Sequence, residues 1–215
     1  MKYKAVIFDL DGTLVNSIYD IADAMNNVLL KHNYKTFDYE TYKTFVGHGV
    51  RSLVVKTLPE SPEKPELINT CLEEMLDVYS KNCTNKTQPY PGILELLETL
   101  KSKNIKLAIL SNKEDSLTKK VATTILPNYI YPILGLKEEA LKKPNPKILL
   151  EICNTLNVKP EESIYVGDTN VDIKVAKNAN TLAVGVSWGF RDKAELIAQG
   201  ANVILEQPKD LLEVL

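Results

Sequence analysis

A short apolar run followed at once by acidic residues lies near the start of the chain, where residues 3–15 read YKAVIFDLDGTLV. Residues 3–8 lack strict polar alternation, which favours a β-strand that is buried on both faces. Asp9 and Asp11 follow on a turn opened by Gly12, so both carboxylates can point into one small pocket. Asp-Gly is also a common turn dipeptide, and its place directly after a buried strand is what makes the string informative.

Further apolar runs of the same kind indicate the rest of a sheet. They lie at residues 105–110, 163–166 and 181–186, with weaker candidates at 130–134 and 202–205. Helical patterns occupy residues 91–103, 145–156 and 171–179 between them. Since strand and helix alternate from about residue 90 onward, we predict an α/β fold with a doubly wound, Rossmann-like parallel sheet.

The region between the first and second predicted strands is helical instead. Helical patterns cover residues 18–32, 39–45, 50–58 and 63–81, and no strand candidate interrupts them. About 70 residues are too many for a simple crossover connection. We therefore predict a helical cap domain at residues 15–86, inserted into an α/β core of residues 1–14 and 87–215.

Composition limits the classes of function. The 215 residues carry 26 Lys and Arg against 28 Asp and Glu, and this net charge of −2 argues against nucleic-acid and membrane-surface partners. The three cysteines show no metal-binding spacing and are expected to be reduced packing residues. The first residues lack a signal-peptide pattern and no apolar stretch approaches the roughly 18 residues of a membrane span, so we expect a cytoplasmic protein.

Three more polar clusters follow predicted strands, at residues 111–113 (SNK), 142–146 (KKPNP) and 167–172 (GDTNVD). Open α/β sheets bind ligands at the carboxyl ends of their strands, so we expect these clusters to meet Asp9 at one edge. Each cluster also has a structural interpretation. Ser111 or Asn112 suits the N-cap of a helix at 114–125, Lys143 suits a solvated surface, and Asp168 suits a plain turn.

Together the clusters supply the groups that phosphoryl transfer needs. Mg²⁺ is typically held by one or two carboxylates plus substrate phosphate oxygens, which fits Asp9 and Asp168. Lys143, Ser111 and the backbone amides of the loops would bind the remaining phosphate oxygens. Such a site acts mainly by positioning the substrate and neutralising its charge.

In this order, residues 9–14, Ser111, Lys143 with its proline, and residues 167–172 resemble the four motifs of the haloacid dehalogenase-like phosphatases. The resemblance covers nearly the whole chain, and the helical insertion is similar to the cap that these enzymes carry between their first two motifs. It implies a Mg²⁺-dependent phosphatase that hydrolyses a small phosphorylated metabolite through an aspartyl-phosphate intermediate. We expect that metabolite to be the partner of a monomer or homodimer.

The resemblance also implies a role for each motif residue. Asp9 resembles the nucleophile, and Asp11 resembles the general acid and base, with Thr13 supporting Asp11. Ser111 and Lys143 resemble the phosphate ligands, and Lys143 would also hold Asp9 in position.

The same resemblance implies a metal site. Asp168 resembles the Mg²⁺ ligand, joined by the carboxylate of Asp9 and the backbone carbonyl of Asp11. Asp172 is either a further ligand or a residue that orients the ligands. Asn112, beside the second motif, is predicted to contact substrate. A hydrolytic dehalogenase is disfavoured, because that chemistry needs neither Asp11 nor a metal.

Residues 45–51 read FVGHGVR and separate two predicted helices of the cap. This segment is either a plain Gly-containing connection or a substrate loop, and it resembles the cap loop of phosphoglycolate phosphatase-like members. Residues 187–191 (SWGFR) are similar to that subgroup too, although Trp188 also suits ordinary packing. In the functional interpretation, His48 or Arg51 contacts a substrate carboxylate.

Other functions remain open at this point. A sugar-phosphate mutase shares these residues, although its relatives usually lack a threonine at the position of Thr13, and a pyrophosphatase uses the same scaffold. A receiver domain also gathers carboxylates, a hydroxyl and a lysine at strand ends, but it is about half as long and lacks the helical insertion. A catalytically silent phosphate-binding protein would not need the complete set of motif residues.

Overall fold

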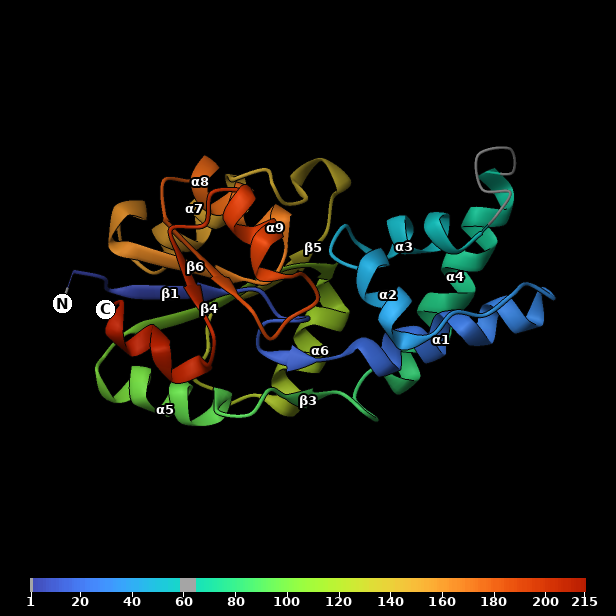
Figure 1. Cartoon of the computed structure of the whole chain (residues 1–215), viewed down its shortest axis with the longest axis horizontal. Coiled ribbons are helices and arrows are strands. Elements are labelled where there is room, and N and C mark those ends of the chain that lie inside the picture. The colour runs from blue at the N-terminus through green and yellow to red at the C-terminus, as the bar shows by residue number, and fades with distance from the viewer. Residues whose placement is uncertain (1, 59–64) are drawn as a thin grey trace.

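The structure, a computed structural model, describes residues 2–58 and 65–215. Within those ranges six parallel strands form one sheet in the order β5-β4-β1-β6-β7-β8 (Figure 1). Their bounds are β1 Ala5–Phe8, β4 Lys106–Glu114, β5 Ile133–Leu136, β6 Ser163–Gly167, β7 Leu182–Val186 and β8 Val203–Leu205. Each strand overlaps a run predicted from the sequence, and the predicted parallel, doubly wound fold is confirmed.

Both faces of the sheet are covered by helices. These are α5 Ile93–Ser102, α6 Asp115–Ile125, α7 Lys147–Thr155, α8 Asn170–Asn178 and α9 Lys193–Ala198, with short 3₁₀ helices at Glu139–Leu141, Pro160–Glu162 and Pro208–Glu213. Val6 and Phe8 of β1 join the apolar cluster that contains α5 and α6, whereas Ala5 and Ile7 join the cluster that contains α7, α8 and α9. Successive side chains of a strand point to opposite faces, so β1 is apolar throughout.

Two details of the core differ from the sequence interpretation. Helix α9 is not predicted, because a helix of six residues is too short to show a helical period. The interpretation of Ser111 or Asn112 as a helix cap is wrong. Strand β4 runs through both residues, and the Glu114 side chain accepts the capping hydrogen bond from the amide of Leu117.

The inserted segment is helical, as predicted. Helices α1 Ile18–Lys31, α2 Tyr39–Phe45, α3 Val50–Thr57 and α4 Pro65–Asn82 lie together at one end of the molecule, beside the sheet (Figure 1). Met25, Tyr42, Leu53 and Met75 are buried between them. The predicted start of the last helix at residue 63 lies outside the described residues.

A short antiparallel ladder lies where the helical cap joins the core, because β2 Val15–Asn16 pairs with β3 Gln88–Pro89. The prediction that no strand interrupts residues 15–86 is therefore wrong at β2, since two residues show no periodicity. Asp20 of α1 is buried and accepts hydrogen bonds from the amides of Lys86 and Thr87 at 2.9–3.0 Å. The domain boundaries after residues 14 and 86 stay predictions.

The topology places a crevice at the carboxyl end of β1. From β1 the chain passes to β4 on one side and later to β6 on the other, so the strand order reverses there. Such switch points are the ligand-binding positions of open α/β sheets. Figure 1 shows the cap helices beyond this edge. Among the helices of the described chain, none has the length and apolar character that crossing a bilayer requires.

Candidate active site

Asp9 is held rigidly at the end of β1. Its backbone amide donates to the carbonyl of Val166 on β6 at 2.8 Å. Its Oδ1 atom accepts from the amide of Leu10 at 2.7 Å and lies 3.0 Å from the Nζ atom of Lys143. Burial raises the pKa of Asp9 to about 7 against the opposing effect of Lys143, with Asp172 and Asp11 adding to the rise. The carboxylate is therefore fixed, nearly dehydrated and surrounded by other charges.

Lys143 is the central cation of this edge. Its side chain is 2% exposed, and its Nζ atom lies 2.7 Å from Oδ1 of Asp172 and 3.0 Å from the hydroxyl of Tyr165. Burial lowers the pKa of Lys143, but the two carboxylates, Asp172 ahead of Asp9, hold the pKa well above its ordinary value. The buried ammonium therefore stays charged and orients Asp9.

Asp168 follows β6 and is completely buried. A Cβ atom on Gly12 would lie 2.2 Å from Oδ2 of Asp168, and a Cβ atom on Gly189 would lie 2.2 Å from the Cβ atom of Asp168. Only glycines allow both loops to approach this closely, and Gly12 also has a positive φ of 85°. Oδ2 accepts a hydrogen bond from the amide of Phe190 at 2.8 Å. Two glycine-containing loops thus build the pocket around this carboxylate.

Thr13 contacts Asp168 and not Asp11, which differs from the supporting role predicted for it. The hydroxyl of Thr13 donates to Oδ1 of Asp168 at 3.2 Å and is fully buried. The carbonyl of Thr13 accepts from Nε1 of Trp188 at 3.0 Å. Trp188 therefore anchors the loop that follows β1, which goes beyond the packing role considered from the sequence.

Asp172 lies in the first turn of α8, where its carboxylate is fully engaged. Oδ2 accepts from the amide and hydroxyl of Thr169 at 3.0 and 2.6 Å, forming the N-terminal capping box of the helix. Oδ1 accepts from Lys143 at 2.7 Å and from the hydroxyl of Tyr165 at 3.2 Å. Of the two roles considered for Asp172, these contacts favour orienting Lys143.

The carboxylates form a site that suits a hard divalent cation. Within the described part of the chain, one ligand oxygen each from Asp9, Asp168 and Asp172 lies within 4.8 Å of the others, and all three residues are buried. Burial, followed by Asp172 and Asp9, raises the pKa of Asp168 well above its ordinary value. Lys143 alone cannot balance three ionised carboxylates, so a cation with a preference for oxygen ligands fits this donor set.

Asp11 forms an ion pair that the sequence analysis missed. Its Oδ1 atom accepts from Nζ of Lys113 at 2.6 Å and from the hydroxyl of Ser17 at 2.5 Å. Lys113 also donates to the hydroxyl of Tyr79 on cap helix α4 at 2.5 Å. Residues two apart on a strand share a face, so the spacing of Ser111 and Lys113 was the signal that could have revealed the lysine.

Ser111 and Asn112 lie in the last part of β4, and both line the pocket. The Ser111 hydroxyl accepts a hydrogen bond from the amide of Lys113 at 3.2 Å and shares the pocket lining with Asp9 and Asp11. Asn112 accepts from the amide of Lys143 at 2.8 Å and donates to the carbonyl of Gly47 in the cap at 3.2 Å. Asn112 therefore links the core to the cap loop. The sequence predicts only a contact between Asn112 and substrate.

The structure does not bring the two predicted cap residues into the pocket. Arg51 is exposed and donates to Oδ1 of Asn69 on α4 at 2.9 Å. His48 is half-buried, and its Nδ1 atom has no hydrogen-bond partner within the described residues. The neighbouring backbone does reach the site, since Gly47 and Gly49 line it. Arg191 of the core donates to the carbonyls of Lys43 and Val46 and holds this loop in place.

A cavity of about 70 Å³ lies between the core and the cap. Its polar lining comes mainly from the strand ends and includes Asp9, Asp11, Ser111 and Lys113. Its apolar lining comes mainly from the cap and consists of Ile21, Val46, Val50, Leu53, Met75, Leu76, Leu117 and Phe190. Charged groups therefore line the core side of the cavity, and apolar groups line most of its cap side.

Fold and site together define an enzyme of phosphate-ester chemistry, and comparison with known proteins agrees. Residues 6–186 match the family model described as haloacid dehalogenase-like hydrolase. The chain belongs to this family, and among its members it is a phosphoric monoester hydrolase. The resemblance drawn from the sequence motifs is confirmed.

Similar proteins cover the whole chain. A phosphoglycolate phosphatase of Aquifex aeolicus is 34% identical over 213 residues, which are 99% of this chain and 96% of the relative. An N-acetylmuramic acid 6-phosphate phosphatase of Pseudomonas aeruginosa is 28% identical over 100% and 96% of the two chains.

Solved structures have the same fold. A predicted phosphoglycolate phosphatase from Haemophilus somnus has a TM-score of 0.89 at 26% identity, over 100% of this chain and 98% of the other. A haloacid dehalogenase-like protein from Streptococcus pneumoniae also has a TM-score of 0.89, at 25% identity, over 99% and 98% of the chains.

Proposed function

We propose that this protein is a Mg²⁺-dependent phosphatase that hydrolyses a small phosphate monoester through an aspartyl-phosphate intermediate on Asp9. The observation that carries the proposal is the distance of 3.0 Å between Oδ1 of Asp9 and Nζ of Lys143. Asp168 is buried beside Asp9, and Asp11 lines the same pocket as Asp9. A fixed carboxylate next to a charge-neutralising lysine is what in-line attack on a phosphoryl group requires.

The reaction proceeds in two displacements. A carboxylate oxygen of Asp9 attacks phosphorus, the bond between phosphorus and the ester oxygen breaks, and Asp11 gives the departing oxygen a proton. Asp11 then takes a proton from a water molecule, whose oxygen attacks phosphorus. The bond between phosphorus and Asp9 breaks, and inorganic phosphate and the free carboxylate are restored. Lys143 and Ser111 hold phosphoryl oxygens throughout.

The metal proposal rests on the carboxylate cluster. Asp9 and Asp168 would hold Mg²⁺ together with the backbone carbonyl of Asp11, and Asp172 would orient Lys143. When bound, Mg²⁺ would neutralise the charge that Asp9 and the phosphoryl oxygens bring together. Only the backbone carbonyl of Asp11 is assigned to the metal, so its side chain, which pairs with Lys113 through Oδ1, is assigned to proton transfer.

The relatives support a small substrate of the phosphoglycolate type. Several relatives that match nearly the full chain are phosphoglycolate phosphatases. A phosphatase that acts on N-acetylmuramic acid 6-phosphate is also among the relatives, so a larger sugar-acid leaving group is the competing substrate type. Whether the protein is a monomer or a homodimer stays a prediction.

The proposal is tested by measuring phosphate release from a set of small phosphorylated metabolites with Mg²⁺, with chelator, and with Ca²⁺ added to Mg²⁺. We expect release with Mg²⁺, none after chelation, and inhibition by Ca²⁺, because Ca²⁺ readily takes a carboxylate in bidentate fashion and would occupy both oxygens of Asp9. Full activity in chelator would remove the metal from the mechanism. Good turnover with Ca²⁺ alone would contradict the explanation that bidentate binding of Asp9 to Ca²⁺ blocks its attack on phosphorus.

A further inference from the structure

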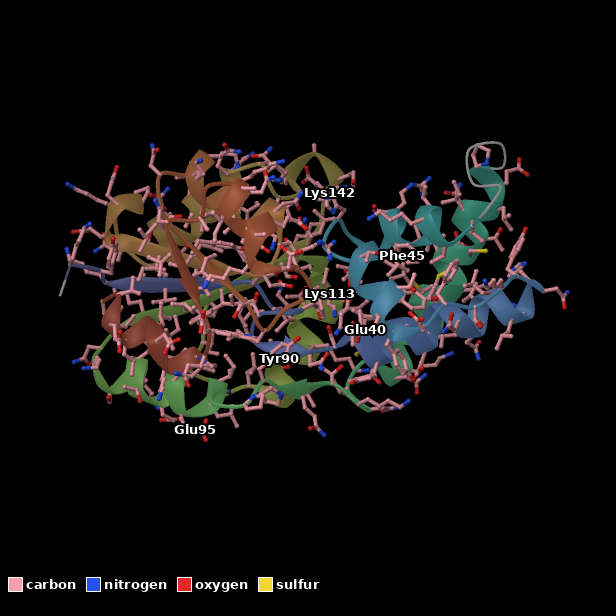
Figure 2. The ribbon with its side chains drawn as sticks, viewed as in Figure 1. Glu40, Phe45, Tyr90, Glu95, Lys113 and Lys142 are labelled. Atoms are coloured by element: carbon pink, nitrogen blue, oxygen red, sulfur yellow. The ribbon has the colours of Figure 1, made fainter. Side chains whose placement is uncertain are left out.

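Lys113 is a buried cation that the proposed hydrolysis does not use. Its side chain is 7% exposed and its Nζ atom lies 2.6 Å from Asp11 and 2.5 Å from the hydroxyl of Tyr79. Among the described residues that line the pocket, Lys113 is the only lysine, arginine or histidine. Figure 2 shows it between the sheet and the cap helices.

The other cationic side chains near the site already have partners or are exposed outside the cavity. Lys143 holds Asp9 and Asp172 and is assigned to the phosphoryl oxygens, at the opposite end of the substrate from the leaving group. Arg191 is bound to backbone carbonyls of the cap, and Arg51 is exposed on α3. The positive charge available to the far end of a substrate is therefore that of Lys113.

Asp11 loses its charge when it acts as the general acid. It must carry a proton to give one to the ester oxygen, and Oδ2 can do so while Oδ1 keeps its contact with Lys113. Lys113 is then a buried ammonium whose two partners, Asp11 and Tyr79, are both neutral, beside apolar cap residues such as Leu53 and Met75. A buried charge without a counter-charge is strongly unfavourable, so an anionic group of the substrate beside Lys113 would stabilise this state.

We propose that Lys113 selects monoesters whose leaving group carries a carboxylate or a similar anion, which pairs with the lysine. This inference rests on the proposed function, since it concerns the leaving-group side of the same pocket. The hydroxyl of Tyr79 belongs to the cap, so the ammonium is held from both domains when the anion binds. Apolar walls make the resulting ion pair stronger than it would be in water.

The test compares three substrates that separate the possible roles of Lys113. In 2-phosphoglycolate the leaving group carries a carboxylate. In 2-hydroxyethyl phosphate the same position carries a neutral hydroxyl. In p-nitrophenyl phosphate the leaving group departs without an acid. The variant is Lys113→Met, which keeps the unbranched side chain up to its Cε atom and removes the charged ammonium. Lys103→Met, an exposed lysine at the end of α5, is the matched control.

We expect wild-type kcat/KM to be at least roughly tenfold higher for 2-phosphoglycolate than for 2-hydroxyethyl phosphate, the size of a buried charge-assisted contact. Lys113→Met should abolish this preference and lower kcat/KM for p-nitrophenyl phosphate much less than for 2-phosphoglycolate, while Lys113→Arg should keep part of the preference. Lys103→Met should behave as wild type.

Equal losses for both alkyl esters would overturn the inference, because Lys113 would then act only by positioning Asp11. If Lys113→Met does not fold, the wild-type comparison decides, and the absence of a preference for the anionic ester overturns the inference. Both outcomes leave the phosphatase assignment intact as long as p-nitrophenyl phosphate is hydrolysed. Failure of the wild type to hydrolyse any of the three esters would overturn the proposed function instead.

Discussion

The two walls of the pocket are built in different ways. On the core side, Asp9 lines the pocket, and Lys143 and Asp168 lie behind it. These three charged groups are almost fully buried and are held by at least two contacts each. On the cap side, the lining is largely apolar, and Tyr79 contributes a hydroxyl that meets Lys113. The core wall therefore fixes the geometry of the chemistry, whereas the cap wall shapes the space for the leaving group.

This division has a physical basis. Buried charges must be paired, so each core carboxylate is held by partners such as Lys143, Thr169 and the amide of Phe190. Apolar contacts have no direction and tolerate rearrangement. Changes on the core wall should accordingly affect all substrates, while changes on the cap wall should affect some substrates more than others.

The largest effect is expected from Asp9→Asn. The amide keeps the shape of the side chain but cannot attack phosphorus, so turnover should fall by several orders of magnitude for every substrate. Phosphate release in the presence of Mg²⁺ measures this loss, with the exposed Asp77→Asn on α4 as the matched control. Near-normal turnover by pure Asp9→Asn would contradict the proposed role of Asp9 as the nucleophile.

A second effect concerns stability and depends on pH. The pKa of Asp9 is raised from 3.8 to about 7, chiefly by burial, so the metal-free folded protein keeps a proton that the unfolded chain loses. Folding is then progressively destabilised as pH rises from about 3.8 to about 7, and this loss is complete above that window. Mg²⁺ binds the ionised form, so it should raise the melting temperature more at pH 8 than at pH 5.

Thermal unfolding with and without Mg²⁺ at the two pH values checks this linkage. Asp9→Asn has no carboxylate to titrate at that position and should show a smaller pH dependence. Equal stabilisation by Mg²⁺ at both pH values in the wild type would contradict the assignment of the metal to these carboxylates.

The smallest effect is expected from Arg51→Ala. The sequence predicts a contact between Arg51 and a substrate carboxylate, but in the structure this side chain is exposed and bonded to Asn69. We expect kcat/KM for 2-phosphoglycolate and for p-nitrophenyl phosphate to stay within about twofold of wild type, as for most exposed polar substitutions. A selective loss of roughly tenfold for 2-phosphoglycolate would show that Arg51 reaches the leaving group after all.

The core wall could be predicted well from the sequence because the sheet topology determines where its residues lie. Parallel strands end at one edge, so polar residues after β1, β4 and β6 had to meet there. The structure brings Asp9, Lys143 and Asp168 together as expected. Their catalytic and metal-binding roles remain proposals.

The cap wall could not be predicted in the same way. Helical periodicity places residues on a face of a helix but does not say how four helices pack over a distant pocket. Nothing in the sequence distinguishes Tyr79 from other buried residues of α4. Arg51 can bind a carboxylate, but its side chain contacts Asn69 outside the pocket. Thr13 was assigned to Asp11 by resemblance, whereas its hydroxyl contacts Asp168, 155 residues away in the chain.

The central claim, covalent attack by Asp9, is tested most directly by trapping the intermediate in Asp11→Asn with p-nitrophenyl phosphate. This leaving group departs without a proton, but water then lacks its general base, a loss of typically 10²–10⁴-fold. We predict a burst of nitrophenol approaching one equivalent per enzyme, followed by slow turnover. Mass spectrometry after an acid quench should find one phosphoryl group on the peptide that contains Asp9. The absence of a burst, together with an unmodified Asp9 peptide, would contradict the claim.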